Sequence, residues 1–276
     1  FFGWTAPLLT SFTECSQKLN VQDNSFNLSP EEKAYLKEHP VLRVHNEKDW
    51  PPFNYFENNS PKGLSIDYMN LLAEKLRITV EYLTGPDWDQ FLTMTKNKEI
   101  DVMLNIVKTE ERAKYLLYTP AYARNPNVIV SLSTARYENM AQLDGKTVAF
   151  PKGFYQGEAL KKSYPNINRL PMKDILASLK AVLFGKADAA LGEIAVFQHI
   201  VSRNMLTGLS MSGEALIGDS DFANLRLAVH KDHPILQTIL TKAVLSITEA
   251  EKDQITSKWL AAGMTEKQQI DLTERE

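Results

Sequence analysis

The stretch that decides the fold is DILASLKAVLFGKADAALGE, residues 174–193. Its apolar residues recur at helical spacing over 175–183, and Gly185 then ends the helix. The short apolar run at 187–191 predicts a strand that is buried on both faces. A helix followed closely by a buried strand is the repeating unit of an α/β fold.

The same alternation of strand and helix signals extends over most of the chain. It predicts strands at residues 41–44, 78–82, 100–104, 147–150 and 225–230, and helices at residues 66–76, 87–96, 233–248 and 249–260. Upstream, Ser29 and Glu32 form a capping box that begins a short helix ending near Pro40, whereas residues 1–28 show no clear periodicity. We therefore expect an α/β fold with mostly parallel sheets.

Composition narrows the classes of function. The chain has 276 residues, of which 43% are hydrophobic and 24% charged, which is typical of a globular protein with one large or two modest domains. Its 31 basic and 34 acidic side chains give a net charge of −3, so it offers no basic field for nucleic acid or for an anionic membrane. The single cysteine, Cys15, excludes an internal disulfide framework.

Three motifs occur in register along the chain. WPPF at 50–53 follows the first predicted strand, NIVKTEER at 105–112 follows a later one with YTPAY at 118–122 behind it, and GKADAALGE occupies 185–193. In this order and at these separations, the motifs closely resemble the bacterial extracellular solute-binding proteins of family 3, the polar-amino-acid-binding group. The resemblance covers about residues 41–262.

This resemblance implies a two-lobed, periplasmic-binding-protein-like fold of type II, with two mixed, mostly parallel sheets flanked by helices. Lobe 1 would comprise residues 41–129 plus 225–262, lobe 2 residues 131–222, and the hinge strands residues 125–130 and 221–225. Residues 1–40 would be a lead-in segment with a short helix, and residues 263–276 a tail towards a membrane-proximal linker. Ligand would bind between the lobes, at the carboxyl ends of the strands.

The lead-in helix is more similar to the sensor-domain branch of the family. That branch implies a periplasmic module of a Gram-negative bacterium, which continues covalently into a transmembrane histidine kinase or diguanylate cyclase; dimerisation stays open. One alternative is a free periplasmic amino-acid-binding protein of an ABC importer, and another is a regulator of an attached peptidoglycan-cleaving domain. A third, from another class, is a dehydratase of the same fold with Glu193 as general acid. The sequence offers no second acid or base beside Glu193, so we expect no enzyme.

Arg112 and Glu193 are the candidate anchors of the ligand. A guanidinium grips a carboxylate through two parallel hydrogen bonds, and the resemblance places Arg112 where the family holds the ligand α-carboxylate. Thr109 predicts the start of a helix. The alternative is therefore that Arg112 is a solvent-exposed residue in the first turn of that helix and binds no ligand. Glu193 follows the strand at 187–191, where the family often has an Asp that receives the ligand ammonium. Its alternative is to begin a helix.

Aromatic and acidic residues are expected around these anchors. Trp50 and Trp88 match positions where the family places aromatic rings around the ligand, although core packing is their alternative. Glu47 sits where some relatives have an acid that faces the ligand, and exposure is its alternative. Tyr155 and Gln156 lie in a turn from strand to helix, where free amides could bind a carboxylate.

Asn105 and Val107 lie on the loop before Thr109, whose backbone would contact the ligand. The family frequently has Gly and Thr or Ser at these positions, so Val107 departs from an ordinary amino-acid contact set. We therefore expect an amino-acid-like or carboxylate ligand.

No metal and no cofactor is expected. His230 and His233 are close in sequence but lack a nearby Cys or a cluster of Asp and Glu at ligand spacing, and the chain has neither a phosphate-binding glycine loop nor a Gly-x-Ser-x-Gly motif. The expected partner is a small molecule.

Overall fold

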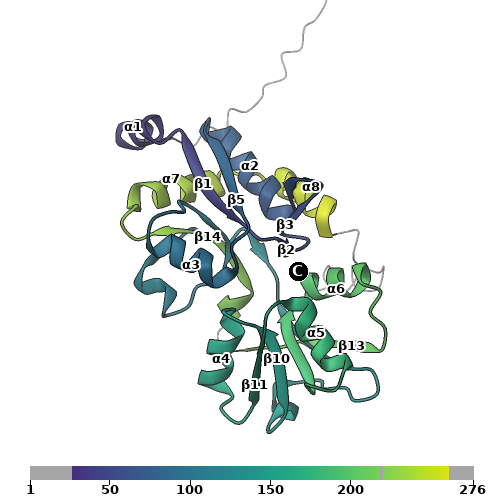
Figure 1. Cartoon of the computed structure of the whole chain (residues 1–276). Coiled ribbons are helices and arrows are strands. Elements are labelled where there is room, and N and C mark those ends of the chain that lie inside the picture. Colours follow the sequence, from purple (N-terminus) through teal and green to yellow (C-terminus); the bar gives the residue numbers. More distant parts are fainter. Residues whose placement is uncertain (1–26, 218–219, 261–276) are drawn as a thin grey trace, which may run out of the picture.

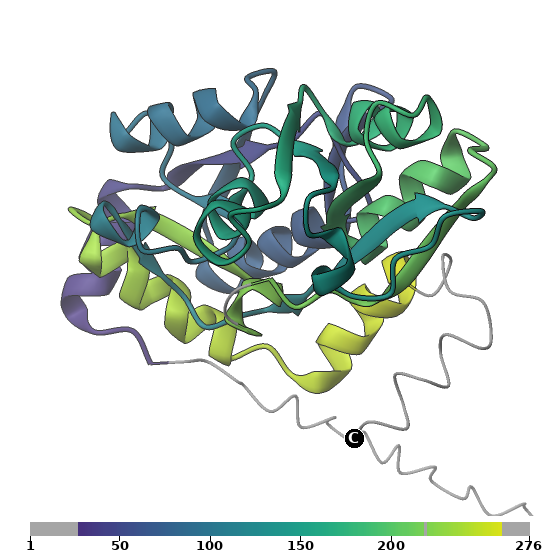
Figure 2. The ribbon, with the colours of Figure 1, turned by 90° about the horizontal axis from the view of Figure 1, so that it is seen from below.

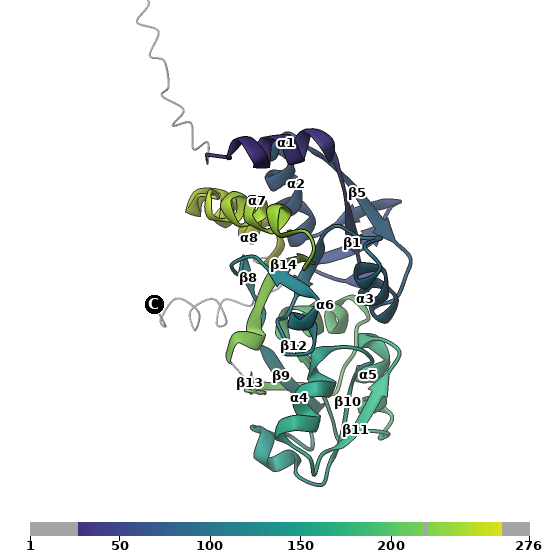
Figure 3. The ribbon, with the colours of Figure 1, turned by 90° about the vertical axis from the view of Figure 1, so that its left-hand side faces the viewer.

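The structure, a computed structural model, describes residues 27–217 and 220–260. These residues form two α/β lobes, one above the other in Figure 1 and again in the turned view of Figure 3. The expectations for most of the lead-in segment and for the tail lie outside the described residues.

The sheet of the first lobe combines strands from both ends of the described chain. Its strands are β1 (Val41–Asn46), β5 (Thr79–Thr84), β6 (Met103–Ile106), β7 (Leu116–Tyr118), β8 (Ala123–Arg124) and β14 (Asn224–His230). β1 and β5 are parallel, and a parallel bridge between Val44 and Val102 joins β1 to the segment before β6. β14 lies between β6 and β7, antiparallel to both, and its first residues pair with β8.

Helices flank this sheet. They are α1 (Pro30–Glu38), α2 (Leu64–Leu76), α3 (Trp88–Lys96), α7 (Pro234–Leu245) and α8 (Glu249–Leu260). The capping box predicted at Ser29 and Glu32 is confirmed, and Glu32 also accepts a bond of 2.7 Å from Lys242, which ties α1 to α7. Figure 2 shows α7 and α8, in yellow-green and yellow, running one after the other along one side of the molecule.

A small antiparallel sheet borders the space between the lobes. It contains β2 (Asp49–Trp50), β3 (Asn54–Glu57) and β4 (Ser60–Lys62). Tyr55 of β3 is buried, and its ring centroid lies 6.1 Å from that of Trp259 on α8. Because the Trp259 indole N–H donates to Asp67 of α2 at 2.7 Å, the end of α8 is held against both the small sheet and α2.

The second lobe contains a five-stranded sheet in the order β11-β10-β12-β9-β13. Its strands are β9 (Asn127–Leu132), β10 (Thr147–Pro151), β11 (Asn168–Met172), β12 (Ala189–Glu193) and β13 (Leu209–Glu214), and its helices are α4 (Tyr155–Ser163), α5 (Ile175–Leu183) and α6 (Ile194–Arg203). β10 is parallel to β11 and to β12, whereas β9 runs antiparallel to β12 and to β13.

The stretch at 174–193 folds as its pattern predicts. Asp174 caps α5 by accepting from the Ala177 N–H at 2.7 Å, and Gly185 follows the helix with φ +67°. Ala189, Ala190 and Leu191 of β12 are fully buried, as expected for a central strand covered on both faces.

Within the described residues, two segments join the lobes along neighbouring paths. The first is residues 125–126, between β8 and β9, and the second includes residues 215–217 and 220–223, between β13 and β14. The backbone N–H of Asn125 donates to Ala223, and that of Ala215 donates to Asn127, each at 2.7 Å. The exact boundaries expected for the lobes and the hinge stay predictions.

Candidate functional site

A cavity between the lobes brings together residues from distant parts of the sequence. Its volume is about 350 Å³, part of which is open to solvent. The lining residues are His45, Glu47, Trp50, Asn54, Trp88, Asn105, Val107, Arg112, Phe154, Tyr155 and Glu193.

Arg112 is a buried cation in the wall of this cavity, only 3% exposed. Its Nη1 donates to the Val107 carbonyl at 3.1 Å, and its Nη2 reaches the Gly153 carbonyl of the second lobe at 3.3 Å. Its Nε has no partner, and no carboxylate within residues 27–217 and 220–260 forms an ion pair with it. Burial lowers the pKa of Arg112, because the interior disfavours an uncompensated charge.

The prediction of a helix that starts at Thr109 is wrong. The Thr109 hydroxyl does accept from the Arg112 N–H at 3.3 Å, but only the 3₁₀ turn η1 (Arg112–Lys114) follows, and its N-cap residue is Glu111. β7 begins at Leu116, which leaves too few residues for an α-helix. Consequently Arg112 is not a solvated first-turn residue, and its side chain lies inside.

Glu193 is the last residue of β12 and the residue that precedes α6, and it is 4% exposed. Its Oε1 accepts from Gln156 Nε2 at 2.8 Å, and the same nitrogen donates to Asn127 Oδ1 at 3.1 Å. Burial raises the pKa of Glu193 to about 7, and its own backbone N–H, Gln156 and the charge of Arg112 counteract that effect only in part.

Arg112 and Glu193 line the same cavity but form no ion pair with each other. Each of them is held by neighbours of its own, Arg112 by backbone carbonyls and Glu193 by Gln156. The expected pair of opposite charges therefore faces the cavity from two lobes, and neither charge neutralises the other directly.

Aromatic rings close the cavity on several sides. The Trp88 ring lies 5.7 Å from Phe154 of the second lobe, and the Arg112 guanidinium lies 5.4 Å from the centre of the Trp88 ring. Trp50 packs on Phe53 at 4.9 Å, and both belong to an apolar core that also contains residues of the second lobe. The two tryptophans thus combine the packing and cavity-lining roles considered for them.

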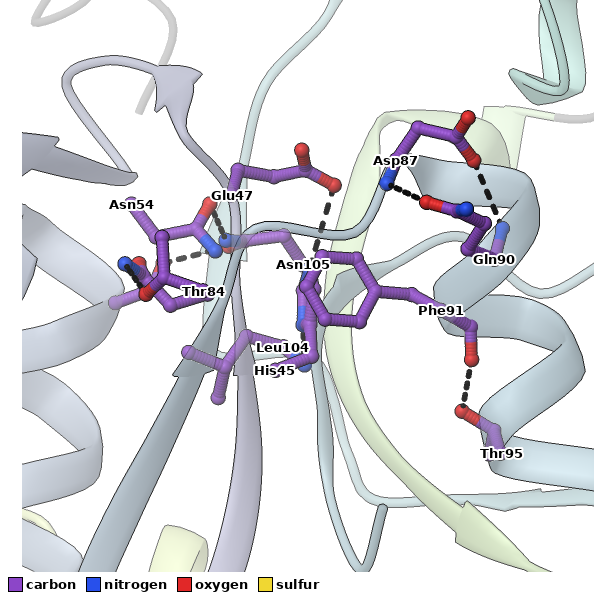
Figure 4. Close-up of polar contacts among 12 residues, drawn as sticks. His45, Glu47, Asn54, Thr84, Asp87, Gln90, Phe91, Thr95, Leu104 and Asn105 are labelled. Atoms are coloured by element: carbon purple, nitrogen blue, oxygen red, sulfur yellow. Dashed lines mark hydrogen bonds and ion pairs between the residues drawn. The ribbon is translucent and has the colours of Figure 1, made fainter. Parts of the chain in front are cut away.

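A cluster of polar side chains of the first lobe lies at the ends of β1, β3 and β6 (Figure 4). His45 Nδ1 accepts from the Leu104 N–H at 3.0 Å, and His45 Nε2 lies 3.5 Å from Glu47 Oε1. Asn105, which has φ +55°, donates through Nδ2 to Asn54 Oδ1 at 2.9 Å. These contacts fix the side chains that surround the mouth of the cavity.

Contacts between exposed groups hold the lobes together around the cavity. Lys162 lies 2.8 Å from Glu110, and Lys152 lies 3.9 Å from Asp89. Gly153 has φ +79°, and a Cβ atom added there would lie 2.1 Å from Asp89 Oδ1 of the opposite lobe. The lobes are therefore in direct contact on the side of α3.

Every sequence-predicted site residue except Gln156 lines the cavity, and Gln156 lies behind Glu193 as its hydrogen-bond donor. Their contact with a ligand stays a prediction. The Val107 carbonyl, expected to be a ligand contact, already accepts from Arg112. The prediction missed His45, Asn54 and Phe154. Two of these residues could have been predicted as site residues from the sequence. His45 is at the carboxyl end of a parallel strand, and Asn54 directly follows the WPPF motif.

No helix within residues 27–217 and 220–260 combines the length and the apolar character needed to cross a bilayer. Over the same two ranges, no group of three or more His, Cys, Asp or Glu side chains is arranged to hold a metal ion.

Comparison with known proteins identifies the family to which the chain is similar. The sequence profile of the bacterial extracellular solute-binding proteins, family 3, matches residues 42–262. The virulence sensor protein BvgS of Bordetella pertussis is 25% identical over 213 residues, which are 76% of this chain and 17% of that protein. The chain therefore spans about a sixth of the length of that sensor.

A further relative and a solved domain of BvgS each match over most of their own length. The arginine-binding extracellular protein ArtP of Bacillus subtilis is 25% identical over 219 residues, which are 76% of this chain and 82% of that protein. The crystal structure of the periplasmic VFT2 domain of B. pertussis BvgS superimposes with a TM-score of 0.74 at 23% identity, covering 84% of this chain and 99% of that domain. This superposition confirms the predicted two-lobed fold.

Proposed function

This chain belongs to the bacterial extracellular solute-binding proteins of family 3, and from that premise we propose that it is the ligand-binding module of a sensor protein. It would lie in the periplasm, close its lobes on a small carboxylate-bearing molecule and pass the change to a membrane-spanning signalling protein of which it is part. One observation carries the proposal: Arg112 is a buried cation between the lobes that lacks an ion-pair partner among the described residues.

Arg112 connects ligand binding to closure. Because its Nη2 donates to Gly153, the guanidinium contacts the second lobe only when the lobes are together. An anion in the cavity would offset the cost of burying the guanidinium, and that cost is highest in the closed state. Such an anion would bind the closed state more tightly than the open state. It therefore shifts the open–closed equilibrium towards closure, by as much as its affinities for the two states differ.

The sensor role rests on likeness to sensor proteins and on the position of α8. BvgS is named as a virulence sensor, and a protein of Escherichia coli K12 that is 24% identical over 234 residues is named as the sensor protein EvgS. α8 packs on α2 and, through Trp259, on the small sheet beside the cavity. A change at the cavity would therefore reach the helix that leads to the C-terminal part of the chain.

A free binding protein of an importer is the second candidate. The match to ArtP, which covers 82% of that protein, is consistent with this alternative. Both candidates use the same cavity, so ligand binding does not separate them. Ligand-dependent autophosphorylation or nucleotide cyclisation by the protein that contains this chain would establish the sensor role, and delivery of ligand to a transporter would exclude it.

The binding function is tested with the whole chain and a panel of amino acids and small carboxylates. We expect one class to raise the midpoint of thermal unfolding, since a ligand that binds the folded state stabilises it by mass action. Arg112→Ala should remove that shift while the circular dichroism spectrum is kept. Arg43→Ala is the matched control, because Arg43 pairs with Asp101 on the first-lobe sheet and does not line the cavity. A panel without any response, or an Arg112→Ala variant that binds as well as the parent, would refute the proposal.

A further inference from the structure

The cavity wall contains a cluster of buried N–H groups that have no hydrogen-bond partner among the residues that the structure describes. They belong to four residues that line the cavity: Trp50 through Nε1, Trp88 through Nε1, Asn54 through Nδ2 and Arg112 through Nε. Buried polar groups are hydrogen-bonded in the great majority of cases, so four such donors around one space point to a group that accepts from them.

His45 adds a fifth donor. Its Nδ1 accepts from the Leu104 N–H, so the proton of the neutral imidazole is on Nε2. That nitrogen is buried, and its nearest acceptor is Glu47 Oε1 at 3.5 Å, too far for a good hydrogen bond (Figure 4). His45 therefore presents an N–H at the cavity.

The acceptors of the wall are largely occupied. Asn105 Oδ1 accepts from Ser65 and Tyr122, and Asn54 Oδ1 accepts from Asn105. The Glu193 carboxyl accepts from Gln156 and from its own backbone N–H. Among the lining residues that the structure describes, Glu47 Oε1 is the one buried side-chain oxygen left without a hydrogen bond.

We propose, building on the binding function proposed above, that the cavity selects a small carboxylate without the α-ammonium group of an amino acid. A carboxylate only accepts hydrogen bonds, which matches a wall of unpartnered donors, and its charge compensates Arg112. An ammonium group only donates, and apart from Glu47 Oε1 the acceptors of the wall are already used internally. The small volume also favours a compact ligand.

The test uses pairs of ligands that share a carbon skeleton and differ in the α-amine: alanine with propionate, glutamate with glutarate, and phenylalanine with 3-phenylpropionate. Calorimetry on the whole chain at low salt should show that the amine-free member of the best-fitting pair binds at least tenfold more tightly. Tighter binding of the amino acid would overturn this inference but leave the binding function intact. Binding of neither member in any pair would overturn both.

Two kinds of variant test the donor wall itself. Trp50→Phe and Trp88→Phe keep a ring but remove the N–H, and each should weaken carboxylate binding by roughly tenfold. Trp259→Phe is the matched control, because its indole N–H bonds to Asp67 outside the cavity, and it should leave affinity unchanged. Equal affinity in the parent and in both cavity variants would overturn the inference.

Glu47→Gln should change affinity in opposite directions for a carboxylate without an amine and for an amino acid. Removing the negative charge beside the donors should tighten carboxylate binding several-fold, because repulsion between the two carboxylates is lost. If Glu47 instead received a ligand ammonium, the same substitution would weaken binding, and that result would contradict the inference.

Discussion

Arg203 of α6 and Asp49 of β2 form an ion pair across the cleft, with Nη1 3.2 Å from Oδ1. Both side chains are about half exposed, so the pair contributes little to the stability of either lobe alone. Its place between the lobes gives it a different role, because the contact exists only when the lobes are closed. Together with the pairs Lys162–Glu110 and Lys152–Asp89, it makes closure depend on charges at the rim.

Reversing one charge of this pair should favour the open state. We expect Arg203→Glu to weaken ligand binding by about fivefold, because exposed pairs are worth at most about 1 kcal/mol. Combining it with Asp49→Arg should restore affinity, and high salt should reduce the difference between variant and parent. Calorimetry measures the affinities, and small-angle scattering reports the open fraction. A double variant no better than the single one would contradict this role.

Gly153→Ala should disfavour closure without changing a lining side chain. The new Cβ would overlap the carboxylate end of Asp89 on the opposite lobe, so that side chain has to turn away, and φ +79° is strained for alanine. Gly185→Ala is the matched control, because φ is +67° there but the space around it is open. Both variants should lose comparable stability in urea, and only Gly153→Ala should lose ligand affinity, by about threefold. Equal affinity losses would show that backbone strain alone is responsible.

Glu193 should make stability depend on pH. Its pKa is 4.5 in the unfolded chain and about 7 in the folded protein, so the folded state holds the proton more tightly. The resulting stabilisation is fully present below pH 4.5 and is lost as pH rises through about 7. Relative to Glu193→Gln, the parent should lose up to about 3 kcal/mol of unfolding free energy between pH 4.5 and pH 8. Urea titrations at both pH values measure this, with exposed Glu158→Gln as control. A gap between parent and Glu193→Gln that stays constant with pH would contradict the assignment.

Tyr55 should transmit closure to α8. Its ring centroid lies 6.3 Å from that of His199 on α6 and 6.1 Å from that of Trp259, so Tyr55 packs between the second lobe and α8. In the parent, ligand should slow hydrogen exchange in residues 253–260, and Tyr55→Leu should reduce that response while ligand still binds. Tyr35→Leu, on α1, is the control and should respond as the parent does. An unchanged response in Tyr55→Leu would exclude this route.

The cavity residues were predicted mainly from the resemblance to the family, and their places after strands agree with that resemblance. Glu47, Arg112 and Glu193 each follow a predicted strand, and strand ends meet at one edge of an α/β sheet. The approximate helix and strand positions were also predictable, since α3 and α5 carry both apolar spacing and a side-chain cap.

Other features depend on contacts that a linear pattern does not contain. The place of His45 near the end of β1 was visible in the sequence, but its burial was not, because α3 covers that face of the strand with Phe91, whose ring lies 4.9 Å from the His45 ring. Thr109 carries a helix signal that the early start of β7 overrides. The Val107 carbonyl accepts a hydrogen bond from the Arg112 side chain, five residues later. Helix and strand propensities do not predict this contact.

The position of β14 between β6 and β7 sets an order for biosynthesis. A ribosome releases β1, β5, β6 and β7 long before residues 224–230, and until those residues emerge β6 and β7 lack the strand that joins them. The second lobe, by contrast, takes all its strands from one continuous segment. We therefore expect the second lobe to fold first, while the unfinished first lobe exposes strand edges that are prone to aggregation and suited to a holding chaperone.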